Sequence, residues 1–452
     1  MVRMGNIISF VNEILWERNI LVWMLIGAGL FFSVKTKFVQ LRLFKHMLSL
    51  VRENNEEKSQ GITSFQAFCI STASRVGAGN LVGVVAAVSI GGAGSIFWMW
   101  VMAVIGSASA FAETVLAIIY RGKTKDGKYV GGPAFFLDKG LGKKWLGVLF
   151  VMSALICWAG VMQVVSNSVT ESFKVAFGID QLTVTMILIV LTGVVIFGKR
   201  DKISMLLSKL VPLMSALYLL VVLFIVIKNI NLIPGLMTEI VSQALGIKQA
   251  VGGSLGAVIM IGIKRGLFSN EAGSGSAPSA AASADVDHPV KQGLLQALGV
   301  FVDTILICSA TAFVMLLADI DKTNLTGMEF LQESFRYHVG DWGVIFIALI
   351  LFLFSFSTVL GIMFYAKNNI MFLSERDIFQ NMFKILVLVM LFQGGIQRNL
   401  FIWSLADFGI GLMTVINLIG IVLLSKEVKG CLENYEGNLL KKQKMGKTKI
   451  TI

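Results

Sequence analysis

Two apolar segments of the chain carry polar residues and glycines at their centres, where a simple membrane helix would carry neither. Segment 63–91 has the centre Arg75-Val76-Gly77-Ala78-Gly79-Asn80. As one continuous helix this segment would be about 43 Å long, which exceeds the roughly 30 Å hydrocarbon core of a bilayer. Because glycine and asparagine are poor helix formers, this centre favours an unwound stretch of backbone inside the span.

Segment 248–283 is longer still and has a more polar centre. It contains the run Lys264-Arg265-Gly266-Leu267-Phe268-Ser269-Asn270-Glu271-Ala272-Gly273-Ser274-Gly275-Ser276-Ala277-Pro278. Charges at membrane depth are costly against lipid, so this backbone should line a cavity that is buried in protein. We expect the helix to break between Arg265 and Gly275.

The two centres share a spacing, because Arg75, Asn80 and Gly83 recur as Arg265, Asn270 and Gly273. A second pair supports the repeat: Pro133-Ala134-Phe135-Phe136-Leu137 resembles Gly327-Met328-Glu329-Phe330-Leu331. Both pairs correspond if the second to sixth spans repeat as the seventh to eleventh. Five spans per half is an odd number, so the halves must be inverted. Interrupted helices at corresponding positions of inverted halves indicate a transporter binding site.

The first break offers positive backbone groups. A new helix N-terminus presents free N–H groups, so the amides around Ala78, Gly79 and Asn80 are suited to a carboxylate. Glycines at 77 and 79 would let a ligand approach the backbone closely. The alternative, in which Gly77 and Gly79 only permit tight helix packing, stays open at this point.

The second break offers the opposite charge. Carbonyls between Arg265 and Phe268 would face an amino group, with Ser269 and Asn270 nearby, because a helix C-terminus presents unpaired C=O groups. The two breaks together therefore predict an amino acid zwitterion as the ligand.

Hydroxyl and amide side chains in two further spans extend this site. Ser355, Ser357 and Thr358 lie in the ninth span, and we expect Ser357 and Thr358 to bind Na⁺ together with the backbone at Arg75 and Val76. The alternative is that each hydroxyl bonds back to its own helix. The fourth span carries four polar residues, of which we expect two to line the substrate site: Gln163 and Asn167, beside Ser166 and Ser168.

The whole chain must supply membrane helices to position these residues. It has 452 residues, of which 56% are hydrophobic and 15% charged, well below the charge of a soluble domain. We predict an all-α polytopic membrane protein with about eleven transmembrane helices, arranged as a 5+5 inverted repeat plus one extra N-terminal helix. The spans lie near 19–35, 63–91, 95–120, 145–170, 182–198, 203–228, 248–283, 289–316, 340–366, 378–393 and 398–424.

The basic residues predict an orientation. The connections on one side hold 19 Lys and Arg residues and the connections on the other side hold six. Since cytoplasmic loops are the basic ones, the N-terminus should lie outside the cell membrane and the C-terminus in the cytoplasm. We divide the chain into 1–62 (N-terminal helix, with a cytoplasmic amphipathic segment at 41–59), 63–228 and 248–424 (the repeats) and 425–452 (a basic cytoplasmic tail).

The remaining reactive side chains do not form another site. The cysteines at 69, 157, 308 and 431 are too scattered for a disulfide framework or a zinc site. Glu113, Asp303 and Asp407 are expected to pair with Arg75, Arg265 or an interface lysine, with a coupling role left open for Asp303. His46, His288 and His338 fall in loops or interfaces, which weakens a histidine proton relay. No H-E-x-x-H motif or K⁺-filter motif occurs, so an intramembrane enzyme or a channel is disfavoured.

Several motifs resemble the alanine-or-glycine:cation symporter family, from about residue 15 to 425. They are Gly77-Ala78-Gly79-Asn80-Leu81-Val82-Gly83-Val84, Phe97-Trp98-Met99-Trp100, Gly131-Gly132-Pro133, the run from Lys264 to Pro278, and Phe356-Ser357-Thr358-Val359-Leu360-Gly361. The resemblance implies Na⁺-coupled, sometimes H⁺-coupled, amino acid uptake on the leucine-transporter-type inverted-repeat fold. It also implies that substrate and cation bind at Ala78, Gly79, Asn80, Ser269, Asn270, Ser357 and Thr358.

The sequence departs from this family at three positions. Ala78 stands where members usually have Thr, Ala93 where they often have Pro, and Val165 where many have Gln. The losses at 78 and 165 make the site less polar or roomier. We expect Na⁺-coupled symport of a small neutral amino acid such as alanine or glycine by alternating access. The alternatives are H⁺ coupling or a larger substrate such as glutamine.

Overall fold

The computed structural model describes residues 2–53, 61–198, 202–247, 254–321, 325, 327–397 and 400–444, and almost all of its regular structure is helical. The first part contains α1 (Val2–Asn12), η1 (Glu13–Glu17), α2 (Ile20–Lys35), α3 (Val39–Arg42), α4 (Phe44–Val51), α5 (Ser64–Arg75), η2 (Gly79–Gly83), α6 (Val84–Gly91) and α7 (Gly94–Ile119). A hairpin of β1 (Gly122–Lys123) and β2 (Tyr129–Val130) precedes α8 (Pro133–Lys139), α9 (Lys144–Phe177), α10 (Gln181–Ile196) and α11 (Lys202–Lys228).

The second part begins with η3 (Ile230–Leu232), α12 (Ile233–Ala244), α13 (Leu255–Asn270), α14 (Pro278–Ala281), α15 (Pro289–Val300), η4 (Phe301–Cys308) and α16 (Ser309–Leu316). It ends with α17 (Met328–Val339), α18 (Asp341–Leu373), α19 (Asp377–Ile396), α20 (Leu400–Leu423) and α21 (Ser425–Lys444). Four sequence-predicted segments fall partly outside the described residues: the end of 41–59, the starts of 248–283 and 398–424, and the end of the tail.

The structure confirms a polytopic membrane protein built from helices. Within the described ranges, seven helices are long and apolar enough to cross a bilayer, or nine if each of two bent helix pairs counts as one span. Helices α10 and α13 have 16 residues each, which is short for a full span. The count of eleven and the inverted repeat therefore stay predictions.

One of the two bends was predicted from the sequence. Helices α5 and η2–α6 meet at an angle of 43°, as expected for a break in segment 63–91. The other bend, of 47°, separates the N-terminal α1–η1 from α2 and was not predicted. Its cause is local, because Asn19 adopts a left-handed conformation (φ 58°) and stops the preceding helix.

The second polar segment breaks within the range that the sequence predicts, between Arg265 and Gly275. Helix α13 continues to Asn270, with the Glu271 amide donating to the Leu267 carbonyl at 2.9 Å. The irregular stretch is therefore 271–277, followed by the single turn of α14. The carbonyls without a helical donor are therefore those of the last turn of α13. The carbonyls that follow directly from Arg265, which were predicted to face the amino group, lie before this turn.

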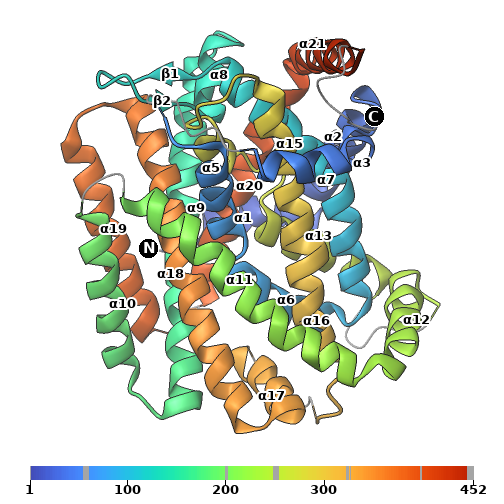
Figure 1. Ribbon diagram of the computed structural model, residues 1–452. Coiled ribbons are helices and arrows are strands. Elements are labelled where there is room, and N and C mark those ends of the chain that lie inside the picture. The colour runs from blue at the N-terminus through green and yellow to red at the C-terminus, as the bar shows by residue number, and fades with distance from the viewer. Residues whose placement is uncertain are drawn as a thin grey trace.

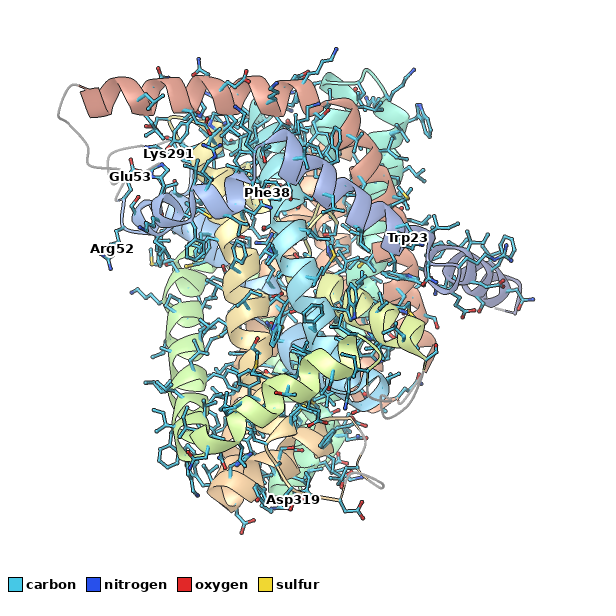
Figure 2. All side chains as sticks on the ribbon, turned by 90° about the vertical axis from the view of Figure 1, so that its right-hand side faces the viewer. Trp23, Phe38, Arg52, Glu53, Lys291 and Asp319 are labelled. Carbon is cyan, nitrogen blue, oxygen red and sulfur yellow. The ribbon has the colours of Figure 1, made fainter. Side chains whose placement is uncertain are left out.

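Short elements close the two ends of the helix bundle (Figure 1). The β-hairpin, α8 and α21 lie at one end, and α12 and α17 lie at the other. Helix α21 runs across the first end, as Figure 2 shows, and is fixed by an ion pair between Arg42 and Glu436 (2.6 Å) and by a hydrogen bond from Lys35 Nζ to Ser425 Oγ (2.7 Å). The predicted basic tail therefore begins as an ordered amphipathic helix, with buried Val428, Leu432 and Tyr435.

Candidate substrate and cation site

The first break is a tight turn centred on Val76. Val76 has φ −75° and ψ 73°, and the Gly77 amide donates to the Arg75 carbonyl at 2.8 Å, which is the geometry of an inverse γ-turn. The same amide also donates to Asn80 Oδ1 at 3.0 Å. Since an uninterrupted helix would bond the Gly77 amide to the Ala73 carbonyl, the turn removes the helical donor from that carbonyl.

Two hydroxyls of α18 reach the Ala73 carbonyl. Thr358 Oγ1 lies 3.3 Å and Ser357 Oγ 3.4 Å from this oxygen, and the two hydroxyls lie 2.9 and 2.8 Å from the Phe354 carbonyl. All of these groups are buried, and Gly77 is packed so closely that an added Cβ would overlap Thr358 Oγ1. Two hydroxyl and two carbonyl oxygens thus converge beside the break, and hard oxygen ligands of this kind suit Na⁺.

Arg75 was predicted as a backbone ligand of the cation, whereas Ser355 was assigned no ligand role. The Arg75 carbonyl accepts the hydrogen bond of the γ-turn. The Arg75 guanidinium points to α15, where Nη1 lies 3.1 Å from both the backbone oxygen and Oε1 of Gln296. Ser355 is buried with no hydrogen bond within the described residues. The Ala73 and Phe354 carbonyls were not predicted, because every residue has a backbone oxygen and the residue type does not indicate which of them binds a ligand.

A small cavity lies next to these oxygens. Its volume is about 30 Å³, which is room for about two water molecules, so it must widen to hold an amino acid. Four residues that the sequence identified line it, namely Ala78, Gly79, Phe268 and Thr358. The two breaks meet here, because a Cβ added to Gly79 would lie 3.4 Å from the Phe268 carbonyl oxygen.

The asparagine and serine side chains of the two breaks point instead to Asp303 of η4. Its Oδ1 accepts from Asn80 Nδ2 at 2.7 Å, and its Oδ2 accepts from Ser269 Oγ at 2.9 Å. Asn270 Nδ2 donates to Thr304 Oγ1 of the same π-helical turn at 3.1 Å. These side chains therefore tie both breaks to a third helix, and substrate contacts by Asn80, Ser269 and Asn270 remain a prediction.

Helix α9 forms an apolar wall of the cavity. Its lining residues are Cys157, Trp158, Val161, Val164 and Val165. The predicted Gln163 and Asn167 are not among them: Gln163 Nε2 lies 2.7 Å from the Met390 sulfur of α19, and Asn167 Nδ2 has no hydrogen-bond partner in the described part of the chain. Val165, one of the family departures, thus faces the cavity directly.

The second break is held by a buried carboxylate. Glu113 of α7 accepts hydrogen bonds from the Gly273 amide (3.4 Å) and the Gly275 amide (3.1 Å), and from Asn417 Nδ2 (2.6 Å). Gly273 and Gly275 have φ values of 83° and 84°, which favour glycine. Glu113 therefore stabilises the loop through backbone amides, and no ion pair with Arg75 or Arg265 occurs among the described residues.

Glu271 was missed in the sequence. It is the acid within the second polar centre, it lines the cavity, and its Oε1 accepts from Ser74 Oγ at 2.6 Å. An acid at membrane depth is itself a functional signal, and this one could have been identified in that way. Asp407, in contrast, pairs with Lys264 at 2.5 Å.

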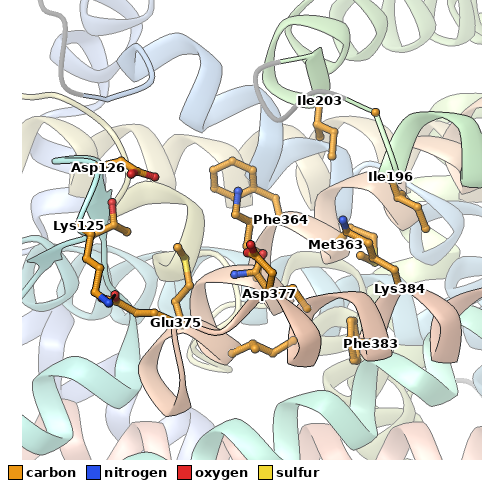
Figure 3. A pocket seen from close by; sticks show the side chains of 16 residues that line it. Lys125, Asp126, Ile196, Ile203, Met363, Phe364, Glu375, Asp377, Phe383 and Lys384 are labelled. Carbon is orange, nitrogen blue, oxygen red and sulfur yellow. Dashed lines mark ion pairs between the residues drawn. The ribbon is translucent and has the colours of Figure 1, made fainter.

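A wider cavity of about 410 Å³ lies away from this site, between the ends of α10, α18 and α19 and the β-hairpin (Figure 3). It is lined by lysines and acids, including Lys384, Asp377 and the ion pair between Lys125 and Glu375 at 3.7 Å. None of the predicted substrate or cation residues lines it.

The amino-acid sequence is similar to those of known transport proteins over nearly its whole length. The model of the sodium:alanine symporter family matches residues 1–450. The chain is 43% identical over 433 residues to the probable sodium/glutamine symporter GlnT of Bacillus subtilis, covering 95% of this chain and 90% of that protein. It is 43% identical over 423 residues to the amino-acid carrier protein AlsT of the same organism, covering 93% and 90%. Over 432 residues it is 37% identical to the sodium/alanine symporter AgcS of Methanococcus maripaludis, covering 93% and 94%. The chain therefore belongs to the sodium:alanine symporter family, whose members are multi-pass membrane symporters and not enzymes.

Proposed function

We propose that this protein couples Na⁺ influx to the uptake of a small neutral amino acid by alternating access. The observation that carries the proposal is that a cluster of oxygen atoms and the lining of the cavity meet at the first break. The Ala73 carbonyl on one side of Val76 meets the hydroxyls of Ser357 and Thr358, and Ala78 and Gly79 on the other side line the cavity.

This geometry gives each ligand a chemical reason to bind. Na⁺ would be held by the carbonyl and hydroxyl oxygens, and the substrate carboxylate by the amides at the start of the second half-helix. Because the proposed Na⁺ oxygens precede this turn and the substrate amides follow it, Na⁺ binding would stabilise the conformation of the turn that accepts the amino acid. The predicted N-out, C-in orientation then makes the inward Na⁺ gradient the driving force.

The test is uptake into proteoliposomes with an imposed gradient. Radiolabelled alanine should accumulate when an inward Na⁺ gradient is present and should only equilibrate when K⁺ replaces Na⁺. Equal accumulation with and without the Na⁺ gradient would exclude Na⁺ coupling, and accumulation driven by an imposed pH gradient alone would support the H⁺-coupled alternative.

A larger substrate such as glutamine is the second candidate. The observation that favours it is the small side chain of Ala78 at the cavity, where members of the family usually have Thr, because it leaves more room for a longer substrate. A relative with 43% identity is named a probable sodium/glutamine symporter. Competition of unlabelled glutamine against labelled alanine separates the two, since the tighter substrate gives the lower half-inhibitory concentration.

A further inference from the structure

Glu271 is a buried carboxyl group with one oxygen left without a hydrogen-bond partner among the described residues. The residue is 9% exposed and adopts a left-handed backbone conformation (φ 55°, ψ 15°), which turns its side chain out of the α13 helix. Oε1 accepts from Ser74 Oγ at 2.6 Å, whereas Oε2 has no hydrogen-bond donor among the described residues. A buried carboxylate oxygen without a donor is costly, so a donor at this position would be bound strongly.

No cation forms an ion pair with Glu271 within the described residues. The guanidinium of Arg75 acts on Glu271 only at a distance, because it is turned toward Gln296. The other titratable groups that influence Glu271 are Tyr365, Cys157 and Asp303, and none of them is cationic. The Tyr365 hydroxyl lies close to the Glu271 carboxyl group but donates to the Ser71 carbonyl at 3.4 Å, so it does not satisfy Oε2. Glu271 is also the one residue with a charged side chain among the described residues that line the cavity.

We propose that Glu271 Oε2 receives the α-ammonium group of the substrate, an inference that rests on the proposed amino acid transport. The cavity then has a negative carboxylate at Glu271 and a positive half-helix N-terminus at Ala78 and Gly79. An α-amino acid zwitterion matches both, and its side chain would lie against the valines of α9. This replaces the backbone carbonyls of α13 as the principal ammonium ligand.

The inference predicts a specific chemical selectivity. A 2-hydroxy acid such as lactate has the carboxylate and side chain of alanine but carries a neutral hydroxyl in place of the ammonium group. Such an analogue leaves the buried carboxylate without a cation, and sites of this kind discriminate by factors on the order of 10⁴. An amide at position 271 would remove the charge while keeping the shape and the Ser74 hydrogen bond.

The experiment measures the affinities of alanine and lactate for the purified full-length protein in Na⁺, by calorimetry or thermal shift. The wild type should prefer alanine by at least about 1,000-fold, and E271Q should bind alanine about 100-fold more weakly and reduce the preference to about tenfold. The control variant Lys384→Gln, in the distant cavity, should leave both affinities unchanged. If E271Q folds poorly, Glu271→Asp provides the second test, with weaker alanine binding but a retained preference for the ammonium group.

Three outcomes would overturn the inference. The first is an unchanged alanine-to-lactate affinity ratio in E271Q. The second is that Na⁺ without amino acid no longer raises the melting temperature of E271Q, which would make Glu271 a Na⁺ ligand. The third is that E271Q changes only the pH dependence of transport, which would make Glu271 a proton carrier. If the wild type binds no amino acid in Na⁺, the proposed function fails as well. Amino acid binding by the wild type together with unaltered selectivity of E271Q contradicts the inference alone.

Discussion

The two helix breaks differ in length and in what stabilises them. The first spans three residues, 76–78, and is closed by its own backbone and by the adjacent Asn80 side chain. The second spans seven residues, 271–277, and is held by the side chains of Glu113 and Asn417 from two other helices. The first break therefore presents its free backbone groups to ligands, whereas much of the backbone of the second is already bonded to protein.

This difference assigns different roles to the breaks. The first offers backbone oxygens and amides to Na⁺ and carboxylate, and glycine keeps the α18 hydroxyls close to it. The second offers a side chain, Glu271, on a loop whose position depends on a distant carboxylate. Substitutions at the first break should change ligand affinity, and substitutions around the second should change stability together with affinity.

The largest effect is expected for Gly77→Ala. An added Cβ would overlap Thr358 Oγ1, so the hydroxyl must move away from the Ala73 carbonyl. We expect the Na⁺ concentration for half-maximal uptake to rise by a factor on the order of 100. Gly83→Ala is the matched control, because its Cβ would meet no atom closer than 3.8 Å and should leave Na⁺ activation unchanged. Equal effects of the two variants would refute the packing argument.

Removal of the hydroxyl alone should have a smaller effect. Thr358→Val keeps the shape of the side chain and deletes one proposed Na⁺ ligand, so Na⁺ should bind about tenfold more weakly. Thr358→Ser retains the oxygen and should stay close to the wild type in Na⁺-dependent thermal shift. Unchanged Na⁺ activation in Thr358→Val would remove this residue from the site.

At the second break, Glu113→Gln should mainly reduce stability. The amide cannot accept from the Gly273 and Gly275 amides and Asn417 together, and hydrogen bonds to a buried charge contribute about 2 kcal/mol. The melting temperature should fall by a few degrees, with weaker amino acid binding. Glu375→Gln, which alters the exposed pair with Lys125, should change the free energy of unfolding by less than about 0.5 kcal/mol. Similar melting temperatures for both variants would contradict the assigned role of Glu113.

The smallest effect is expected from pH, at the end of the bundle that α21 covers. Burial lowers the pKa of His46 and His288 below their ordinary value of 6.5, and both rings pack on Tyr435 of α21. Since the unfolded chain binds more protons below pH 6.5, stability should be constant above that pH and should fall as the pH drops toward the folded-state pKa values. We expect a decrease on the order of 2 °C between pH 7.5 and 5.5. His46→Gln should reduce it, and an unchanged slope would exclude His46 as its source.

Much of the fold follows from hydropathy. The predicted spans at 95–120, 203–228 and 289–316 agree closely with α7, α11 and the α15–α16 segment, because long apolar runs have one stable solution in lipid. The break at Gly77 could also be predicted, since glycines and polar residues interrupt an apolar run there. The bend at Asn19 could not be predicted, because the left-handed conformation is only one of several that asparagine can adopt.

The site could be predicted only where residue type carries the chemistry. Ser357 and Thr358 were identified by their hydroxyls, and the structure brings both to the first break. The Ala73 and Phe354 oxygens could not be found in this way, because every residue has a carbonyl. The end of α13 lies within the predicted range, but the carbonyls from Arg265 to Leu267 stay inside the helix, since Arg265 packs on Trp403 and Asn270 bonds to Thr304.

The central claim is that Na⁺ and an amino acid bind on either side of the same turn and stabilise each other's binding. The most direct test is calorimetric titration of alanine into the purified protein at increasing Na⁺ concentration, with choline keeping the ionic strength constant. We predict that the alanine dissociation constant falls by a factor of about ten or more as Na⁺ saturates, and that alanine tightens Na⁺ binding by the same factor. An alanine dissociation constant that is equal in Na⁺ and in choline would contradict the account.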